Sequence, residues 1–206
     1  MNNKPGFRNW DERYATDDYV FGTEPNDFLK SVAAQVPADS RVLCLADGEG
    51  RNGVYLASLG HRVTSIDQSR AGLDKAERLA DARGVAIETI QADLSTYDLG
   101  SECWDCVVSI FFHIPPAMRD IIYPGIIQSL APDGLLILES YTPAQLAYGT
   151  GGPPVAEMML TLDIARHSFG DLEFLHATET VRDVVEGSGH TGEAAVLQLL
   201  AKKNAS

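Results

Sequence analysis

The sequence is poor in cysteine and in basic side chains. Three cysteines among 206 residues are an odd number, which fits reduced thiols better than a disulfide framework. Lys and Arg number 16 against 29 Asp and Glu, which gives a formal net charge of −13. Nucleic-acid binding draws on clustered Lys and Arg, and no such run occurs in this sequence. We therefore expect a small-molecule ligand and no nucleic-acid partner.

Long apolar runs are missing as well. No run approaches the length of a membrane span, which argues against a membrane partner. The first six residues lack the apolar core of a signal peptide, so we expect a cytoplasmic protein. With 206 residues, 45% of them hydrophobic, the chain is long enough for one domain with a sizeable core but hardly for two.

Two of the cysteines, Cys103 and Cys106, have the spacing of redox and zinc motifs. They lead into the apolar run 107–111, which is typical of a strand, whereas a redox pair lies at a helix N-terminus. A zinc site needs a second pair of ligands, and the sequence offers none at a suitable spacing. We therefore expect core and loop cysteines and no metal site.

What the sequence does contain is a strand, a glycine turn and a helix in succession over residues 41–59. Glycines in such a turn let the backbone approach a ligand, and the helix N-terminus offers unpaired N–H groups and a positive dipole end. The pattern predicts a cradle for a nucleotide-like cofactor, although an ordinary βα turn has the same features. Gly48, Gly50 and Gly53 match the dinucleotide fingerprint literally, so NAD remains an alternative cofactor at this point.

Strands and helices alternate from residue 42 onward. The expected strands are 42–46, 62–66, 87–90, 106–112 and 135–139, and the expected helices between them are 51–59, 69–82 and 116–130. This order predicts a Rossmann-like, doubly wound α/β fold with a mostly parallel sheet and helices on both faces. The strand-like runs 172–186 and 194–201 flank a glycine-rich turn, so the sheet is expected to end in an antiparallel hairpin.

Polar residues gather at the expected carboxyl ends of these strands, where such sheets bind their ligands. Asp67 after the second strand can accept hydrogen bonds from both hydroxyls of a ribose. Asp93 after the third strand suits the exocyclic amine of an adenine, and residues 109–113 follow the fourth strand. Each aspartate alone is equally typical of a turn or a helix cap, but adjacent strand ends with these residue types indicate an adenosine-containing cofactor.

With these motifs the chain resembles the class I S-adenosylmethionine-dependent methyltransferases, whose seven-stranded sheet ends in such a hairpin. The resemblance covers about residues 10–203 and is carried by the segments 42–52, 66–69, 91–94 and 130–136. The segments 10–14, 19–26 and 148–153 are most similar to the small bacterial branch of tellurite-resistance and thiopurine-methyltransferase-like enzymes. Cys44 and Ala46 depart from the family pattern, which usually has an acid and a glycine there, so a catalytically weak cofactor-binding protein is a further alternative.

The resemblance implies S-adenosylmethionine as cofactor, S-adenosylhomocysteine as product, and a single methyltransferase domain over residues 1–206. Its expected parts are an N-terminal helical lid (1–36), a cofactor-binding core (41–141), a substrate-side insertion (142–170) and a C-terminal hairpin (171–203). The expected cofactor-binding residues are Trp10, Tyr14, Ala46, Gly48, Gly50, Arg51, Asn52, Asp67, Gln68, Asp93, Leu94 and Ser109.

The expected function is methyl transfer to a small molecule, possible acceptors being a thiol and a chalcogen oxyanion. A hydroxyl or amine acceptor needs a general base, and His113 and Tyr141 follow the fourth and fifth strands where a base could act. A histidine at that place is also typical of a helix start. The expected substrate-side residues are Tyr19, Tyr148, Gly151 and Gly152.

Overall fold

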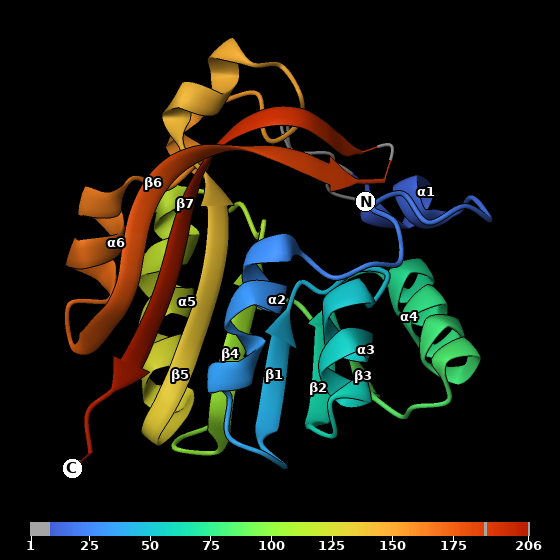
Figure 1. Ribbon diagram of the computed structural model, residues 1–206, viewed down its shortest axis with the longest axis horizontal. Helices are drawn as coiled ribbons and strands as arrows, with labels where there is room; N and C mark the ends of the chain where they lie inside the picture. Colours follow the sequence, from blue (N-terminus) through green and yellow to red (C-terminus); the bar gives the residue numbers. More distant parts are fainter. Residues whose placement is uncertain (1–8, 188, 206) are drawn as a thin grey trace.

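Seven strands form one sheet in the computed structural model, which describes residues 9–187 and 189–205. The first eight residues of the expected lid lie outside this range. The strand order is β3-β2-β1-β4-β5-β7-β6 (Figure 1). The strands are β1 (Arg41–Leu45), β2 (Arg62–Asp67), β3 (Glu88–Gln91), β4 (Trp104–Ile110), β5 (Leu130–Tyr141), β6 (Leu172–Glu186) and β7 (His190–Lys203).

The first five strands pair in parallel, and β7 runs antiparallel between β5 and β6. The expected mostly parallel, seven-stranded sheet with a terminal hairpin is therefore confirmed. The hairpin turn is shorter than expected, because β7 already begins at His190. β5 begins at Leu130, where the preceding helix was expected to end.

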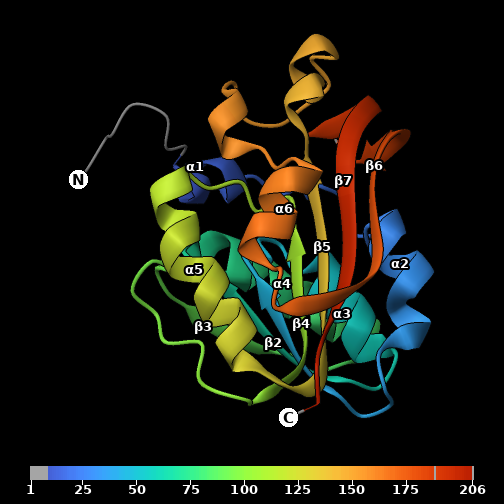
Figure 2. The ribbon, with the colours of Figure 1, turned by 90° about the vertical axis from the view of Figure 1, so that its left-hand side faces the viewer.

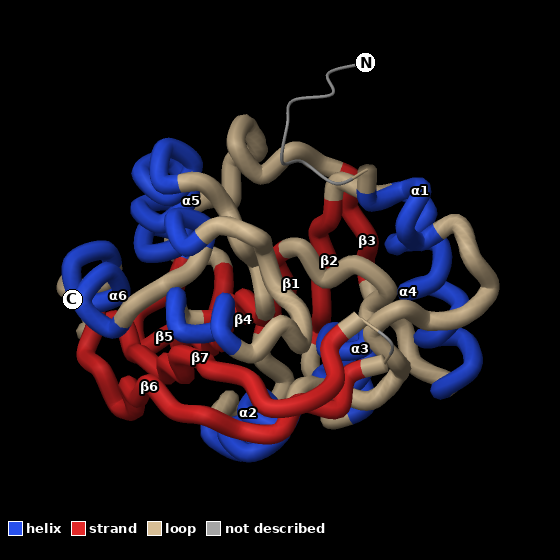
Figure 3. Tube along the Cα trace, turned by 90° about the horizontal axis from the view of Figure 1, so that it is seen from above, coloured by secondary structure: helices blue, strands red, loops and turns tan. Residues whose placement is uncertain are grey.

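Helices cover both faces of the sheet, as Figures 2 and 3 show. The α-helices are α1 (Trp10–Tyr14), α2 (Asp27–Val32), α3 (Arg51–Ser58), α4 (Arg70–Arg83), α5 (Pro116–Ser129) and α6 (Leu162–Ser168). α5 and α6 lie on one face and α2 and α3 on the other, with α4 beside α3. Short 3₁₀ turns occupy Ala33–Gln35, Pro143–Ala147 and Ala156–Met158. No helix in the described part of the chain is long and apolar enough to cross a membrane.

The alternation of side chains along β1 divides the core between the two faces. Leu43 and Leu45 pack with residues of α5 and α6, whereas Val42 and Cys44 pack with residues of α2 and α3. Cys44 is thus a buried core residue, and burial raises the pKa of its thiol well above the ordinary range. Because β1 is central, the segment after it reaches the middle of the edge where the carboxyl ends of the parallel strands meet.

Candidate active site

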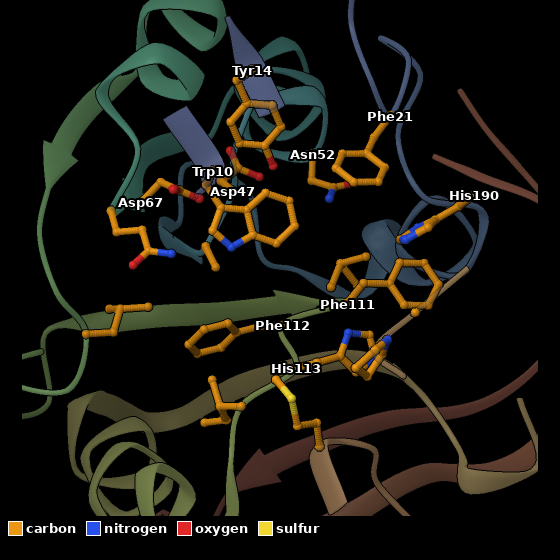
Figure 4. Close-up of a pocket in the computed structure, with 18 of the residues that line it drawn as sticks. Trp10, Tyr14, Phe21, Asp47, Asn52, Asp67, Phe111, Phe112, His113 and His190 are labelled. Carbon is orange, nitrogen blue, oxygen red and sulfur yellow. The ribbon is translucent and has the colours of Figure 1, made fainter. Parts of the chain in front are cut away.

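A pocket opens at the carboxyl ends of β1, β2 and β4, beneath α1 and beside the hairpin turn (Figure 4). Many of the residues expected from the sequence line it, namely Trp10, Tyr14, Ala46, Arg51, Asn52, Asp67, Gln68, Leu94, His113 and Gly152. The expected residues Tyr19, Gly48, Gly50, Asp93, Ser109, Tyr141, Tyr148 and Gly151 are not among its described lining residues. The pocket therefore gathers only part of the expected site.

Asp67 is a buried carboxylate at the candidate cofactor end of the pocket. One of its oxygens accepts a hydrogen bond from the Gly48 N–H at 2.8 Å, and the other accepts from the Ser69 N–H at 2.8 Å. Burial raises the pKa of this carboxyl to about 6, and the backbone donors oppose that shift. The two backbone bonds fix the orientation of the carboxylate at the pocket wall.

The glycine turn after β1 serves packing as much as ligand approach. Gly50 has φ +82°, and a Cβ added there would lie 2.4 Å from the Cβ of Ala76 in α4. Gly48 has φ +56°, and its added Cβ would lie 2.6 Å from the Tyr14 hydroxyl oxygen. Ala46 lines the pocket with φ +49°, a left-handed backbone that a side chain makes costly. Ala46 thus stands where the resembled family usually has a glycine, and its strained backbone lies at the pocket wall.

Asp47, not among the site residues expected from the sequence, also lines the pocket. Its Oδ2 accepts hydrogen bonds from Ser65 Oγ at 2.7 Å and from the Gly53 N–H at 3.3 Å. Burial raises its carboxyl pKa, while Ser65 and the nearby Arg51 charge lower it. Asp47 therefore ties the turn to β2 and the start of α3 next to the cofactor end.

Two carboxylates, which act as anchors, hold the N-terminal segment over the pocket by hydrogen bonds. In α1, Asp11 Oδ1 accepts hydrogen bonds from Ser69 Oγ at 2.6 Å and from the Ala71 N–H at 3.1 Å, at the start of α4. These bonds hold α1 so that Trp10 and Tyr14, stacked with centroids 5.4 Å apart, line the pocket.

The second anchor is Glu49, which belongs to the glycine turn itself. Its carboxylate accepts hydrogen bonds from the N–H groups of Val20 and Phe21 at 3.2 and 3.3 Å and pairs with Lys75 at 2.7 Å. Tyr19, expected at the substrate, instead donates its hydroxyl to the Lys75 carbonyl at 3.0 Å, outside the pocket. The neighbouring Phe21 lines the pocket in its place.

Aromatic rings enclose the other end of the pocket. The Phe111 ring stacks on Tyr141 with centroids 4.6 Å apart and meets His190 edge-on at 5.0 Å, and Phe21 lies 4.7 Å from His190. Phe111 adopts φ +53°, an unusual conformation for a bulky residue, and its N–H donates to the Glu139 carbonyl at 2.7 Å. Strain of this kind is typical of functional sites, which makes this aromatic end the candidate acceptor end.

His113 and Tyr141, the two residues expected as general bases, lie in surroundings that disfavour their charged forms. His113 Nε2 already accepts a hydrogen bond from the Tyr141 N–H at 3.1 Å, and loss of hydration lowers the pKa of His113 to about 3. The Tyr141 hydroxyl is buried without a hydrogen-bond partner among the described residues, and burial raises its pKa far above neutrality. Both side chains therefore support the pocket wall in neutral form.

His190 was not among the expected site residues, although the family resemblance left it open as a substrate-side residue or a residue that fixes the hairpin. It begins β7 and lines the pocket, and its Nδ1 lies 3.9 Å from Glu186 Oε2. Burial lowers the pKa of His190 and the Glu186 carboxylate opposes that shift. Its place in a run of glycines, Gly187 to Gly192, was the available signal for a functional histidine.

The remaining expected residues support the site or lie away from it. Asp93 is exposed, and its Oδ1 accepts hydrogen bonds from the Ser95 N–H and Oγ at 2.9 and 2.7 Å in a local turn. Leu94 beside it lines the pocket. Tyr148 has 37% of its surface exposed, and Ser109 is buried within β4. Gly151 packs behind the pocket, because an added Cβ would lie 2.8 Å from His190 Cδ2.

The sequence matches known methyltransferases over its central part. Residues 42–134 match the family model described as "Methyltransferase domain". The uncharacterized methyltransferase YodH of Bacillus subtilis is 32% identical over 127 residues, which cover 57% of this chain and 52% of YodH. The tRNA 5-carboxymethoxyuridine methyltransferase of Escherichia coli is 31% identical over 87 residues, 42% of this chain and 33% of that protein. The chain thus spans about half or less of the length of these curated relatives.

Solved structures share the fold at low sequence identity. The N-methyltransferase NodS of Bradyrhizobium japonicum, solved with S-adenosyl-L-homocysteine, has a TM-score of 0.69 and 16% identity, covering 94% of this chain and 96% of NodS. TehB of Haemophilus influenzae has a TM-score of 0.69 and 20% identity, covering 95% of this chain and 66% of TehB. The segment 42–134 is thus similar to methyltransferase domains, and the whole chain has the Rossmann-like fold of the class I S-adenosylmethionine-dependent methyltransferases. The TehB likeness in fold agrees with the branch that the sequence resembles.

The cofactor of this family is S-adenosylmethionine, and the residues of the pocket fit it. The Asp67 carboxylate suits the two ribose hydroxyls. The apolar side chains of Ala92, Leu94 and Phe112 line the same end and suit the face of an adenine. Trp10 from α1 completes the enclosure of this end (Figure 4).

Proposed function

We propose that this chain transfers the methyl group of S-adenosylmethionine to a small molecule bound at the aromatic end of the pocket. The observation that supports the proposal is one pocket lined both by Asp67, which suits a ribose, and, on the other side, by Phe111 and His190. A transfer enzyme needs two such adjoining ends, since donor and acceptor must meet in one enclosed space.

At the cofactor end the protein binds and orients. Asp67 accepts the ribose hydroxyls, Leu94 contacts the adenine, and Trp10 covers the bound molecule. When bound, S-adenosylmethionine supplies a methyl group that is already activated by its sulfonium. The anchored α1 segment excludes water from this end, which prevents hydrolysis and strengthens the local electrostatic interactions.

At the acceptor end the protein aligns the nucleophile. The Phe111 ring and Gly152 both belong to the pocket wall and restrict how an acceptor can lie. His190 is the polar group that such an acceptor meets, with its Nδ1 toward Glu186. An imidazole in this position can take the proton that an acceptor loses on methylation.

The similarity to a tRNA-modifying methyltransferase makes an RNA acceptor the alternative to a small molecule. The net charge of −13 opposes binding of a phosphate backbone, because such binding depends on neutralisation by Lys and Arg. An enclosed, largely aromatic acceptor end suits a small molecule better than a nucleotide within a chain. Both features favour the small molecule.

Thermal stability in the presence of ligands tests the cofactor, and turnover tests the transfer. S-adenosylhomocysteine or S-adenosylmethionine at 100 times its Kd is expected to stabilise the protein by about 2.7 kcal/mol, and NAD is expected to have no effect. Methylated product is then measured with 2-mercaptoethanol, selenite and tellurite. Stabilisation by NAD alone would overturn the cofactor assignment. Adenosyl binding without turnover of any acceptor would indicate a catalytically weak cofactor-binding protein.

A further inference from the structure

Two arginines and two glutamates form ion pairs between α3, β5 and the C-terminal hairpin, and Arg51, Glu139 and Glu186 among them are buried. Arg51 Nη2 lies 2.5 Å from Glu186 Oε2, with 8% and 4% of the two side chains exposed. Arg182 makes a two-pronged contact with Glu139, from Nε to Oε1 at 2.9 Å and from Nη2 to Oε2 at 2.5 Å. Each of the two guanidinium groups therefore has its own carboxylate.

Asn26 joins the two ion pairs into one cluster. Its Nδ2 donates to Glu139 Oε2 at 2.5 Å and to Glu186 Oε1 at 2.8 Å. Arg182 Nη2 also reaches Glu186 Oε1 at 3.4 Å. Arg182 also pairs with Asp27 Oδ2 at 3.5 Å, so two guanidinium groups face three carboxylates and no positive charge is left over for a ligand.

Arg51 is the member of this cluster that lines the pocket. Among the described residues of the pocket wall it is the only Arg or Lys, and the remaining fixed charges there are the carboxyl groups Asp47 and Asp67. The Arg51 charge faces Glu186 on one side and lowers the pKa of Asp47 on the other. An oxyanion in the pocket would thus lose its hydration without gaining an unpaired cation from the protein, which is unfavourable.

We propose that Glu186 selects the class of methyl acceptor: by neutralising Arg51 at the pocket wall, it makes the site accept an uncharged, protonated nucleophile such as a thiol and disfavour an oxyanion. This inference rests on the proposed methyl transfer and decides between the two acceptor classes. Glu186 is a positioning residue, since its carboxylate contacts Arg51 and faces His190 and is not required to contact the acceptor.

The chemistry of an uncharged thiol balances within this site. A lone pair of the thiol sulfur forms the new bond to the methyl carbon, and the bond from that carbon to the sulfonium sulfur breaks with its electron pair left on that sulfur. The thiol proton leaves to His190 and from there to water. The products are a methyl thioether, S-adenosylhomocysteine and one proton. A chalcogen oxyanion would need no proton acceptor, so His190 would be idle with it.

The decisive variant is Glu186→Gln, which leaves the Arg51 charge unpaired and keeps the size of the side chain. The ratio of kcat/KM for 2-mercaptoethanol to that for selenite is measured in both proteins. We expect the wild-type protein to favour the thiol, and the variant ratio to fall at least about tenfold towards selenite. Asp183→Asn removes one carboxylate from an exposed position of the same strand and is expected to leave the ratio unchanged.

A binding measurement provides a readout that does not depend on turnover. Sulfate, an unreactive oxyanion, is titrated into each protein saturated with S-adenosylhomocysteine. We expect it to bind at least about tenfold more tightly to Glu186→Gln than to the wild-type protein. Equal sulfate affinity and an unchanged acceptor ratio in a folded Glu186→Gln variant would overturn the proposal, as would a wild-type preference for selenite.

A second variant covers the case in which Glu186→Gln does not fold. Met158 lines the pocket and is only half-buried, so Met158→Lys adds an unpaired cation to the wall and leaves the ion pairs intact. We expect this variant to gain sulfate binding and selenite turnover, with Met158→Gln as the neutral control. Absence of a gain in sulfate binding and in selenite turnover would overturn the proposal.

A wild-type protein that binds S-adenosylhomocysteine but methylates no acceptor would instead contradict the proposed function. Sulfate binding would still test the role of Glu186 in that case.

Discussion

The two ends of the pocket are built in different ways. The cofactor end comes from the central, parallel part of the sheet, where Ala46, Asp67 and Leu94 follow three successive strands within about fifty residues. The acceptor end joins Phe21, Phe111, Gly152 and His190, which lie far apart in the sequence. The residues that bind a cofactor common to a large family thus come from local motifs. The residues that bind an individual acceptor come together through contacts between distant segments. The following changes test whether the two ends are separable.

The largest effect is expected at the acceptor end, from His190→Gln. Loss of the proton acceptor should lower kcat for an uncharged thiol by about 10²-fold, at the lower edge of the usual range for general-base catalysis. Affinity for S-adenosylhomocysteine, measured by calorimetry, should stay within about threefold, because His190 lies away from Asp67 in the pocket. A variant with unchanged kcat and weakened cofactor binding would show that the two ends are not separable.

The next effect is expected at the cofactor end, from Asp67→Ala. Loss of the carboxylate should weaken S-adenosylhomocysteine binding by about 1–3 kcal/mol, the range for a hydrogen-bonded charged group. Asp93→Ala is the matched control, because that exposed carboxylate is engaged only in its own turn and surface changes are usually within about 0.5 kcal/mol. Equal losses of binding free energy in the two variants would indicate that Asp93 also binds the cofactor, as the sequence predicted.

More of the residues expected to bind the cofactor than of those expected at the acceptor line the pocket, for physical reasons. Alternating and continuous apolar runs located the strands, and the strand order predicted that Asp67 lies at the carboxyl edge of the sheet, where it lines the pocket. Asp93 was assigned to the adenine because its side chain can accept hydrogen bonds, but a nearer donor, Ser95, takes it. His113 was chosen as base for its position after β4, which did not reveal that the Tyr141 N–H occupies its Nε2. Contacts of such long range leave no periodic pattern in the sequence.

A smaller and pH-dependent effect is expected from His113→Gln. The pKa of His113 is lowered to about 3 in the folded protein, whereas an unfolded histidine titrates near about 6.5. Between these values the unfolded chain binds a proton that the folded chain does not, so His113 contributes stability that is lost as the pH falls through this window.

Urea unfolding between about pH 3 and pH 6.5 measures this contribution. The variant should lose about one proton from the acid dependence of the unfolding free energy, while the pH profile of kcat keeps its shape. A changed pH profile of kcat would indicate a catalytic role for His113 and would place the acceptor closer to the end of β4.

The smallest effect is expected from Ala46→Gly at the cofactor end. Ala46 holds a left-handed backbone with φ +49°, and glycine adopts it freely. The variant should be more stable by about 0.5–1 kcal/mol, or about 1–4 °C in Tm, after allowance for the greater freedom of glycine in the unfolded chain. A drop in Tm would mean that the Ala46 methyl group packs well enough to offset its strain.

The positions of the two tryptophans give this protein a built-in optical reporter. Trp10 lines the pocket from α1, whereas Trp104 begins β4 at the opposite end of the sheet and donates its indole N–H to the Leu99 carbonyl at 2.9 Å. Occupancy of the pocket should therefore change the emission of the first ring and leave that of the second constant. Stopped-flow fluorescence of Trp104→Phe would then record ligand entry and departure without any attached dye, and Trp10→Phe would supply the silent counterpart.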